Sequence, residues 1–305
     1  MEKSWKVTFE KNGPEGEVLP LEKTFSWGAY TVYIPGVHLF AEGLILDICL
    51  EVNREKMAAF LEKWKDAFRR EPTERERRQI EGENPLLYRY SQKLWVNGVE
   101  LKRCNGQGSS HIPADMLPED LRRERVPAFV EGLGLAEDKV WAWMRMRYFW
   151  EGEKVTQIDS MEMELRQIPY DCLGERFAMP EIGECVTLHH PKTGAGYVLT
   201  VKDIRKETAK LPPQPDTVYP ENVIVMSYQT EPQLSRKVFY LADTEESDPP
   251  KRLSNTESTG GTFGMIMRNP DHYAVSSAHF EPIETVTWQA VFLEKDLEDI
   301  TVKLL

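Results

Sequence analysis

The sequence predicts a mainly β protein built from antiparallel, sandwich-like sheets, with one clear helix and two domains. Most of the chain alternates apolar and polar residues with a period of two between turn residues, as half-buried strands do. Strong helical periodicity occurs in only one segment. The chain has 305 residues, 41% of them hydrophobic, which is enough to fill the cores of two ordinary domains.

The alternating segments predict a series of short strands joined by recognisable turns. Asn97-Gly98 suits a two-residue hairpin turn, and residues 191–194, with the sequence Pro-Lys-Thr-Gly, suit a longer one. The strands are expected at 6–10, 29–34, 44–52, 86–96, 99–103, 140–149, 160–166, 185–190, 197–205, 222–229, 237–242, 264–268, 273–279, 285–292 and 300–304.

Helical structure is predicted mainly at residues 54–70. Asn53 is a suitable N-cap, and apolar residues then recur at spacings of three and four, namely Met57, Phe60, Leu61, Trp64 and Phe68. The charged residues 71–83 contain too few apolar side chains to pack, so we expect a solvated helix end or a loop. A weaker helical region at 118–135 is limited to short pieces by Pro127.

The domain boundary is expected near residue 170. Pro169 and an irregular stretch at 170–183 separate two sets of strands, which gives domains at 1–170 and 171–305. The segments 211–220 and 244–261, rich in Pro, Asp, Ser and Thr, are expected to be long loops or disordered.

Residues 139–166 are predicted to form a β-hairpin with one core face and one charged aromatic face. An even-length turn at 151–154 would place Met144 opposite Met161 and Trp143 opposite Glu162. An odd turn would set arginine against methionine, so we expect the even register.

The charged aromatic face of this hairpin is the candidate binding surface. It comprises Trp141, Trp143, Arg145, Arg147, Glu162 and Glu164. Exposed indoles can stack on sugar rings while carboxylates bind hydroxyls. Arginine stacked on tryptophan with glutamate partners also packs well against another sheet or subunit, and we favour this second interpretation.

The charge balance argues against nucleic acid as a partner. The chain carries 38 Lys and Arg against 50 Asp and Glu, for a net charge of −12, and a phosphate-backbone binder needs a basic footprint. The N-terminus begins charged without a signal-peptide pattern, and no apolar run approaches the roughly 20 residues of a membrane span. We therefore expect a soluble cytoplasmic protein with no membrane partner.

Catalytic and metal sites receive little support from local spacing. Asp47 and Glu51 lie four residues apart in one strand, roughly 13 Å, which is too far for a glycosidase pair with each other. Either could pair with a carboxylate of another strand, but we interpret them as part of a solvated, salt-bridged sheet face. Cys185 and His189 offer too few ligands for zinc, and the four cysteines have no CxxC spacing, so neither a metal nor another cofactor is expected.

Two glycine-rich segments are the remaining catalytic candidates. Residues 104–111 carry Cys104, Ser109 and His111 but lack the GxSxG pattern of a nucleophile elbow. Residues 258–264 lack the lysine of a phosphate-binding loop. We interpret both as ordinary glycine-rich loops.

These observations favour a binding or interaction protein without catalytic activity. Its partner would be a protein, a second copy of the chain, or a carbohydrate. The alternative is a hydrolase that acts on a carbohydrate or a related polar substrate, with a site assembled from separated strands.

Overall fold

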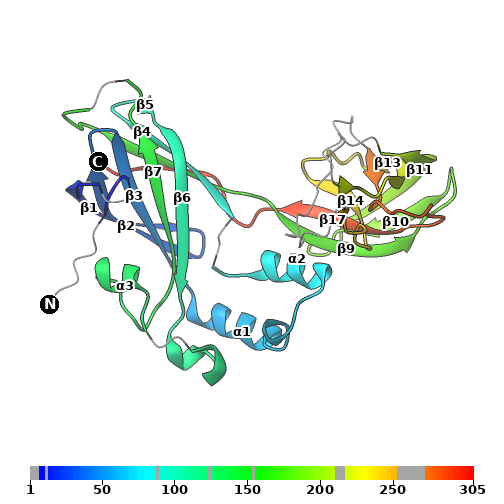
Figure 1. Ribbon diagram of the computed structural model, residues 1–305, viewed down its shortest axis with the longest axis horizontal. Helices are drawn as coiled ribbons and strands as arrows, with labels where there is room; N and C mark the ends of the chain where they lie inside the picture. The colour runs from blue at the N-terminus through cyan, green and yellow to red at the C-terminus, as the bar shows by residue number, and fades with distance from the viewer. Residues whose placement is uncertain are drawn as a thin grey trace. The chain divides into compact units, whose positions relative to one another are not determined.

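The computed structural model describes residues 7–10, 13–86, 89–122, 125–152, 155–209, 217–252 and 272–305 (Figure 1). It is 50% strand and 13% helix, in several antiparallel sheets, which confirms the mainly β prediction. Among the helices in these ranges, none combines the length and the apolar character that a bilayer span requires.

The chain divides into two compact units that do not follow sequence order. Unit 1 contains Met1–Glu71, Glu83–Pro169 and Lys295–Leu305, and unit 2 contains Pro72–Gly82 and Tyr170–Glu294. Two segments therefore differ from the expected 1–170 and 171–305. The C-terminal segment belongs to unit 1 because its strand pairs with residues 162–165 of that unit, and Gly82 lies against the backbone of Asp171 in unit 2.

Unit 1 contains two antiparallel sheets. The five-stranded sheet has the order β1 (Glu17–Trp27), β2 (Tyr30–Leu39), β3 (Gly43–Val52), β7 (Val140–Phe149) and β6 (Lys102–His111). The four-stranded sheet has the order β18 (Ile300–Lys303), β8 (Met161–Gln167), β4 (Tyr90–Val96) and β5 (Val99–Glu100). Trp27 meets Tyr90 at 5.7 Å between ring centroids, and the Gln92 amide contacts the Met144 sulfur, so the two sheets share one core.

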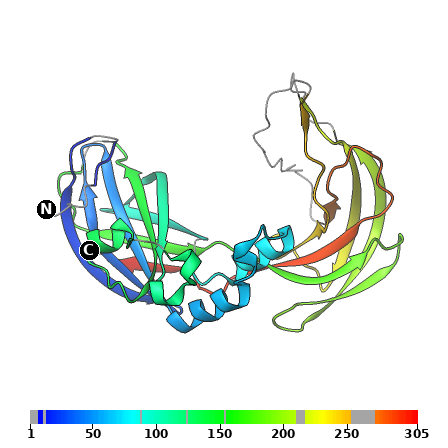
Figure 2. The same ribbon diagram turned by 60° about the horizontal axis from the view of Figure 1, so that its bottom comes forward.

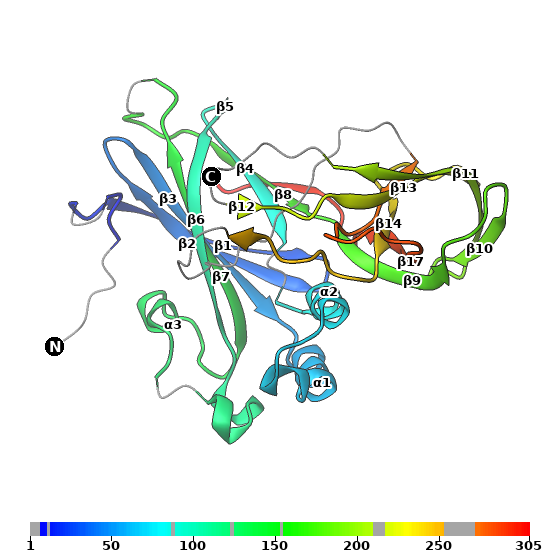
Figure 3. The same cartoon turned by 45° about the vertical axis from the view of Figure 1, so that its right-hand side comes forward.

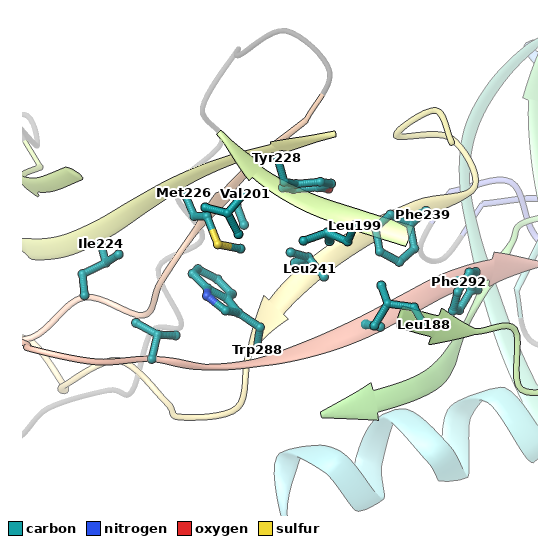
Figure 4. Close-up of a cluster of buried hydrophobic side chains, with 13 residues drawn as sticks. Leu188, Leu199, Val201, Ile224, Met226, Tyr228, Phe239, Leu241, Trp288 and Phe292 are labelled. Carbon is teal, nitrogen blue, oxygen red and sulfur yellow. The ribbon is translucent and has the colours of Figure 1, made fainter. Parts of the chain in front are cut away.

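Unit 2 also joins two main sheets through a common core. One contains β10 (Cys185–His189), β11 (Gly196–Thr208), β13 (Asn222–Glu231) and β16 (Tyr273–Val275), and the other β14 (Phe239–Asp243), β17 (Thr287–Glu294) and β9 (Tyr170–Ala178). Two short strands, β12 (Thr217–Val218) and β15 (Lys251–Arg252), pair separately. Figure 4 shows side chains of both sheets packed together, among them Leu199, Met226, Leu241, Trp288 and Phe292.

The helix predicted after Asn53 is confirmed but is shorter than expected. It is α1 (Arg54–Trp64), and the Asn53 side chain accepts a hydrogen bond of 2.8 Å from the Lys56 N–H. A separate 3-10 turn follows at Ala67–Arg69. The region 118–135 contains only short pieces, as Pro127 predicted: a 3-10 turn at Glu119–Leu121 and α3 (Ala128–Gly132), with another turn before them at Ala114–Met116.

The charged segment 71–83, expected to be a solvated helix end or a loop, contains a separate helix. This helix, α2 (Glu74–Glu83), begins at a capping box in which the Thr73 hydroxyl accepts from the Glu76 N–H at 3.3 Å and the Glu76 carboxylate accepts from the Thr73 N–H at 2.9 Å. The Thr-x-x-Glu spacing in the sequence was the signal for it.

The predicted hairpin at 139–166 is wrong. β7 pairs with β3 and β6, and β8 pairs with β4 and β18, so the two strands lie in different sheets. Met144 lies opposite Ile48 and Gly108 instead of Met161. The alternation predicted which residues share a face, but it carries no information about which strand lies next to which. The observed pairing also sets Asp47 against Arg145, which a local hairpin cannot do.

Several other strand expectations need correction. The long β1 was missed, β9 occupies most of the stretch expected to be irregular, and β6 replaces the expected glycine-rich loop at 104–111. The Asn97-Gly98 turn is confirmed, with φ values of 48° and 79°. The strand expected at 264–268 and the glycine-rich segment 258–264 lie outside the described residues.

The cap of α1 provides a test of this local structure. We expect Asn53→Ala to lower the free energy of unfolding by about 1 kcal/mol, because the Lys56 N–H loses its acceptor. Asn53→Ser retains an acceptor and should stay close to the unsubstituted protein. Urea denaturation of the three proteins measures this, and equal stability of Asn53→Ala and Asn53→Ser would contradict the cap.

Candidate functional site

The candidate site lies on the outer face of the five-stranded sheet in unit 1, the face turned away from the second sheet. Alternate residues of β7 point to this face, and β3 and β6 flank β7 on either side (Figure 3). The strand register places three cross-strand rows here: Cys49, Trp143 and Ser109; Asp47, Arg145 and Gln107; and Ile45, Arg147 and Asn105.

A buried ion pair occupies the middle row. The Arg145 guanidinium donates from Nε to Asp47 Oδ1 and from Nη2 to Oδ2, both at 2.8 Å. Trp143 Nε1 donates to Oδ1 at 3.0 Å. The side chains of Asp47 and Arg145 are 1% and 12% exposed, so the carboxylate has almost no contact with solvent. Both of its oxygens accept hydrogen bonds from charged or polar donors instead. Asp47 is therefore not part of a solvated salt-bridged face, whereas Glu51 on the same strand pairs with Lys139 at a half-exposed position.

The tryptophans of this face pack in one buried cluster with Phe129 and Val130 of α3. The backbone of the segment that carries α3 can be followed along this sheet in green in Figure 2. The Phe129 ring stacks on Trp143 at 5.1 Å between centroids with an interplanar angle of 7°. Trp141 donates from Nε1 to the Ala136 carbonyl at 2.9 Å. The two indoles are 6% and 5% exposed, so they form a packed core beneath α3, and their faces are not open to a sugar ring.

The opposite end of the face is covered by the N-terminal segment around Phe9. The Phe9 ring lies 5.3 Å from Phe40 and 5.4 Å from Phe149 between centroids. The Arg147 guanidinium lies over the same ring, at 5.0 Å from its centroid. Within the described residues, Arg147 Nε is buried without a hydrogen-bond partner, and no carboxylate pairs with this guanidinium.

Between the two covered ends, polar side chains line an exposed strip of the sheet. Asn105 and Gln107 of β6 are exposed beside Arg147 and Arg145. His38 of β2 lies opposite Ile45 on the other side of the row. Burial and the neighbouring Arg145 lower the pKa of His38 from its usual 6.5, against an opposing effect of Asp47, so the imidazole is neutral at pH 7. The strip thus offers hydrogen-bond donors and one unneutralised cation.

Glu162 and Glu164 do not join this surface. They lie on β8 in the other sheet of unit 1, where Glu162 is opposite Trp95 and Lys303, and Glu164 pairs with Arg166. The structure therefore brings together Trp141, Trp143, Arg145 and Arg147 and separates the two glutamates from them.

Asp47 is the residue of the site whose role the sequence did not reveal. The signal lay in its strand, because residues 44–50 are buried on both faces and a carboxylate in such a run needs a cation. Which cation it meets depends on strand order, which the local pattern does not contain.

The other candidates are engaged in structural contacts. His111 Nε2 lies 2.7 Å from the Glu137 carbonyl, His189 pairs with Glu175, and His190 pairs with Glu294. The four cysteines form no disulfide, and Cys49 is the buried one among them, with burial raising the pKa of its thiol. Over the described part of the chain, no three His, Cys, Asp or Glu side chains converge as metal ligands.

Comparison with models of protein families, with curated proteins and with solved structures finds no match. Chemically, the site can accept an anion at Arg147 and hydrogen-bond acceptors or donors at Asn105 and Gln107. Both oxygens of Asp47 already accept hydrogen bonds, Oδ1 from Trp143 and Arg145 and Oδ2 from Arg145.

The contribution of the Asp47–Arg145 pair to stability can be compared with that of the more exposed Glu51–Lys139 pair. We expect Asp47→Ala to lower the free energy of unfolding by about 3–5 kcal/mol, because it leaves Arg145 buried without a counter-charge. Glu51→Ala breaks a more exposed pair and should cost at most about 1 kcal/mol. Chemical denaturation of both variants measures the difference, and equal losses would show that burial of Asp47 has no special role.

The lowered pKa of His38 predicts a pH dependence. The folded state binds this proton less readily than the unfolded state, so the contribution of His38 to stability is present above pH 6.5 and is lost as the pH falls through the lowered pKa. Titration by NMR should give a His38 midpoint below 6.5, and His38→Gln should reduce the acid slope of the unfolding free energy. A midpoint at or above the usual value would contradict the burial of this ring.

Proposed function

We propose that this chain is a binding protein, and that the exposed strip of the outer face binds an anionic group of its partner at Arg147. One observation carries the proposal: the Nε atom of Arg147 is buried and has no hydrogen-bond partner within the described residues. Leaving a buried donor unsatisfied costs about 1–3 kcal/mol, and more for a charged group, so an anion that draws this guanidinium into a hydrogen bond would recover that free energy.

The two arginines of β7 differ in a way that supports this assignment. Arg145 holds Asp47 in a two-point contact, so that pair is neutral. Arg147, two residues further along the same face, contacts the Phe9 ring, and the described residues supply no counter-ion for it. An aromatic ring below a guanidinium fixes its plane while leaving the edge with its N–H groups free to bind a carboxylate or phosphate.

The acidic charge of the whole chain makes a cation without a counter-ion, as at Arg147, unusual. A net charge of −12 repels anions at long range, so an anionic partner would be held by short-range contacts at a local cation. The exposed amides of Asn105 and Gln107 beside the guanidinium add donors for the same group.

The alternative function, a carbohydrate hydrolase, needs two carboxylates that face each other across a substrate. Asp47 is bound through both oxygens to Arg145, and Glu51 is bound to Lys139. No observation on this face favours the hydrolase, so binding is the function we propose.

An anionic probe tests the proposal. We expect a fluorescently labelled poly-glutamate peptide to bind at low ionic strength, and Arg147→Gln to weaken it roughly tenfold, or by about 1.4 kcal/mol. Fluorescence anisotropy measures the affinity, and inorganic tripolyphosphate as competitor shows whether phosphate serves as well as carboxylate.

The matched control is Arg166→Gln, which removes a cation of the same unit that already pairs with Glu164 and Asp299. It should leave the affinity unchanged, and a poly-glutamine peptide should not bind. Equal affinities of Arg147→Gln, Arg166→Gln and the unsubstituted protein, or no binding of either anion, would overturn the proposal.

A further inference from the structure

We propose that β6 is a docking edge at which an extended acidic peptide adds to the five-stranded sheet as a further strand. This inference rests on the proposed function, because it names the partner whose carboxylates would reach Arg147. It adds a second mode of contact, namely hydrogen bonds between the two backbones.

The sheet leaves one side of β6 unpaired. Among the strands that the structure describes, β6 ends the order of its sheet and pairs with β7 alone, from Lys102 to His111. Residues 102–108 are all exposed, and the described residues provide no backbone hydrogen bond to the far side of this strand. An exposed sheet edge presents alternate N–H and C=O groups to any chain that runs beside it.

The opposite edge of the sheet differs from β6 in ways that block such pairing. β1 contains Pro20, which lacks an N–H donor, and a bulge between Pro20 and Lys23 with Glu22 at a φ of 47°. β6 has no proline, and beyond its own bulge at Cys104 it pairs regularly from Asn105 to His111.

Two glycines, Gly106 and Gly108, leave the core-facing side of the middle of β6 without side chains. A Cβ on Gly106 would lie 2.4 Å from the Met146 sulfur, so this position cannot carry a larger residue without repacking the core. Gly108 pairs with Met144 on the same face. On the outer face, the middle of β6 carries the exposed side chains of Asn105 and Gln107. Side chains stand roughly perpendicular to a sheet, so they leave the edge of the strand open to a neighbour.

The charges of β6 and β7 favour an acidic occupant. Lys102 lies on the outer face opposite Phe149, next to the row that contains Arg147. Strands in a sheet are about 4.8 Å apart, so an added strand would contact Lys102 directly and would lie about 10 Å from β7, within reach of a long arginine and a glutamate. Acidic residues at alternate positions of the peptide would meet both cations, since alternate side chains share a face.

The test uses a labelled peptide of about ten residues, the length of β6, with alternating glutamate and threonine. Two further versions carry N-methyl groups on alternate amides, one version for each edge of the extended peptide. Methylation on the edge that faces β6 removes donors and blocks pairing, whereas methylation on the other edge does not. We expect one methylated version to bind at least roughly tenfold more weakly than the other, measured by anisotropy. Lys102→Glu should lower the affinity for the methylated peptide that still binds.

The outcomes separate the two proposals. If both methylated peptides bind as well as the parent and Arg147→Gln still weakens all three, the strand addition is overturned and the anion site stands. If the parent peptide binds equally to Arg147→Gln and to the unsubstituted protein, the proposed function fails. Sedimentation of the protein alone provides the third measurement, and dimers that dissociate in Lys102→Glu would show that β6 pairs with a second copy instead of a peptide.

Discussion

The buried ion pair between Asp47 and Arg145 is the interaction on which the outer face of unit 1 depends. It joins β3 to β7 across the centre of the five-stranded sheet, and both carboxylate oxygens are used. In a weakly polar interior an unpaired charge is costly, so a shifted register that separated the two side chains would be strongly disfavoured. The Trp143 indole binds the same carboxylate, and Phe129 stacks on that indole, so the covering segment is aligned by the pair as well.

This arrangement gives different roles to the tryptophans and the arginines on the outer face of β7. Trp141 and Trp143 are structural, since they lie beneath the α3 segment, and Arg145 neutralises Asp47. Arg147 remains beside an exposed strip of amides and an open strand edge. Under the proposed function, the partner would make a few directed contacts over a strand edge. The buried indoles favour such an anionic, extended ligand over a sugar stacked on tryptophan.

The sequence predicts local structure well and strand order poorly. The cap at Asn53, the Asn97-Gly98 turn and most of the strands follow from the residues themselves, because capping, turn conformation and alternation are local properties. The hairpin predicted at 139–166 is wrong because turn parity distinguishes only two registers of one pairing, whereas β7 pairs with β3 and β6. The candidate site shows the same limit. Arg145 and Arg147 were identified from their strand, but only the fold reveals that Asp47 neutralises one of them and not the other.

A double-mutant cycle between Asp47 and Arg145 tests most directly whether this pair organises the face. The free energy of unfolding is measured for Asp47→Ala, Arg145→Ala and the double variant. We expect the losses of the two single variants to add up to about 2 kcal/mol or more above the loss of the double variant. The reason is that each single variant leaves one buried charge uncompensated, whereas the double variant leaves none. Additive losses within about 0.5 kcal/mol would show that the two side chains act independently and would contradict the central role of the pair.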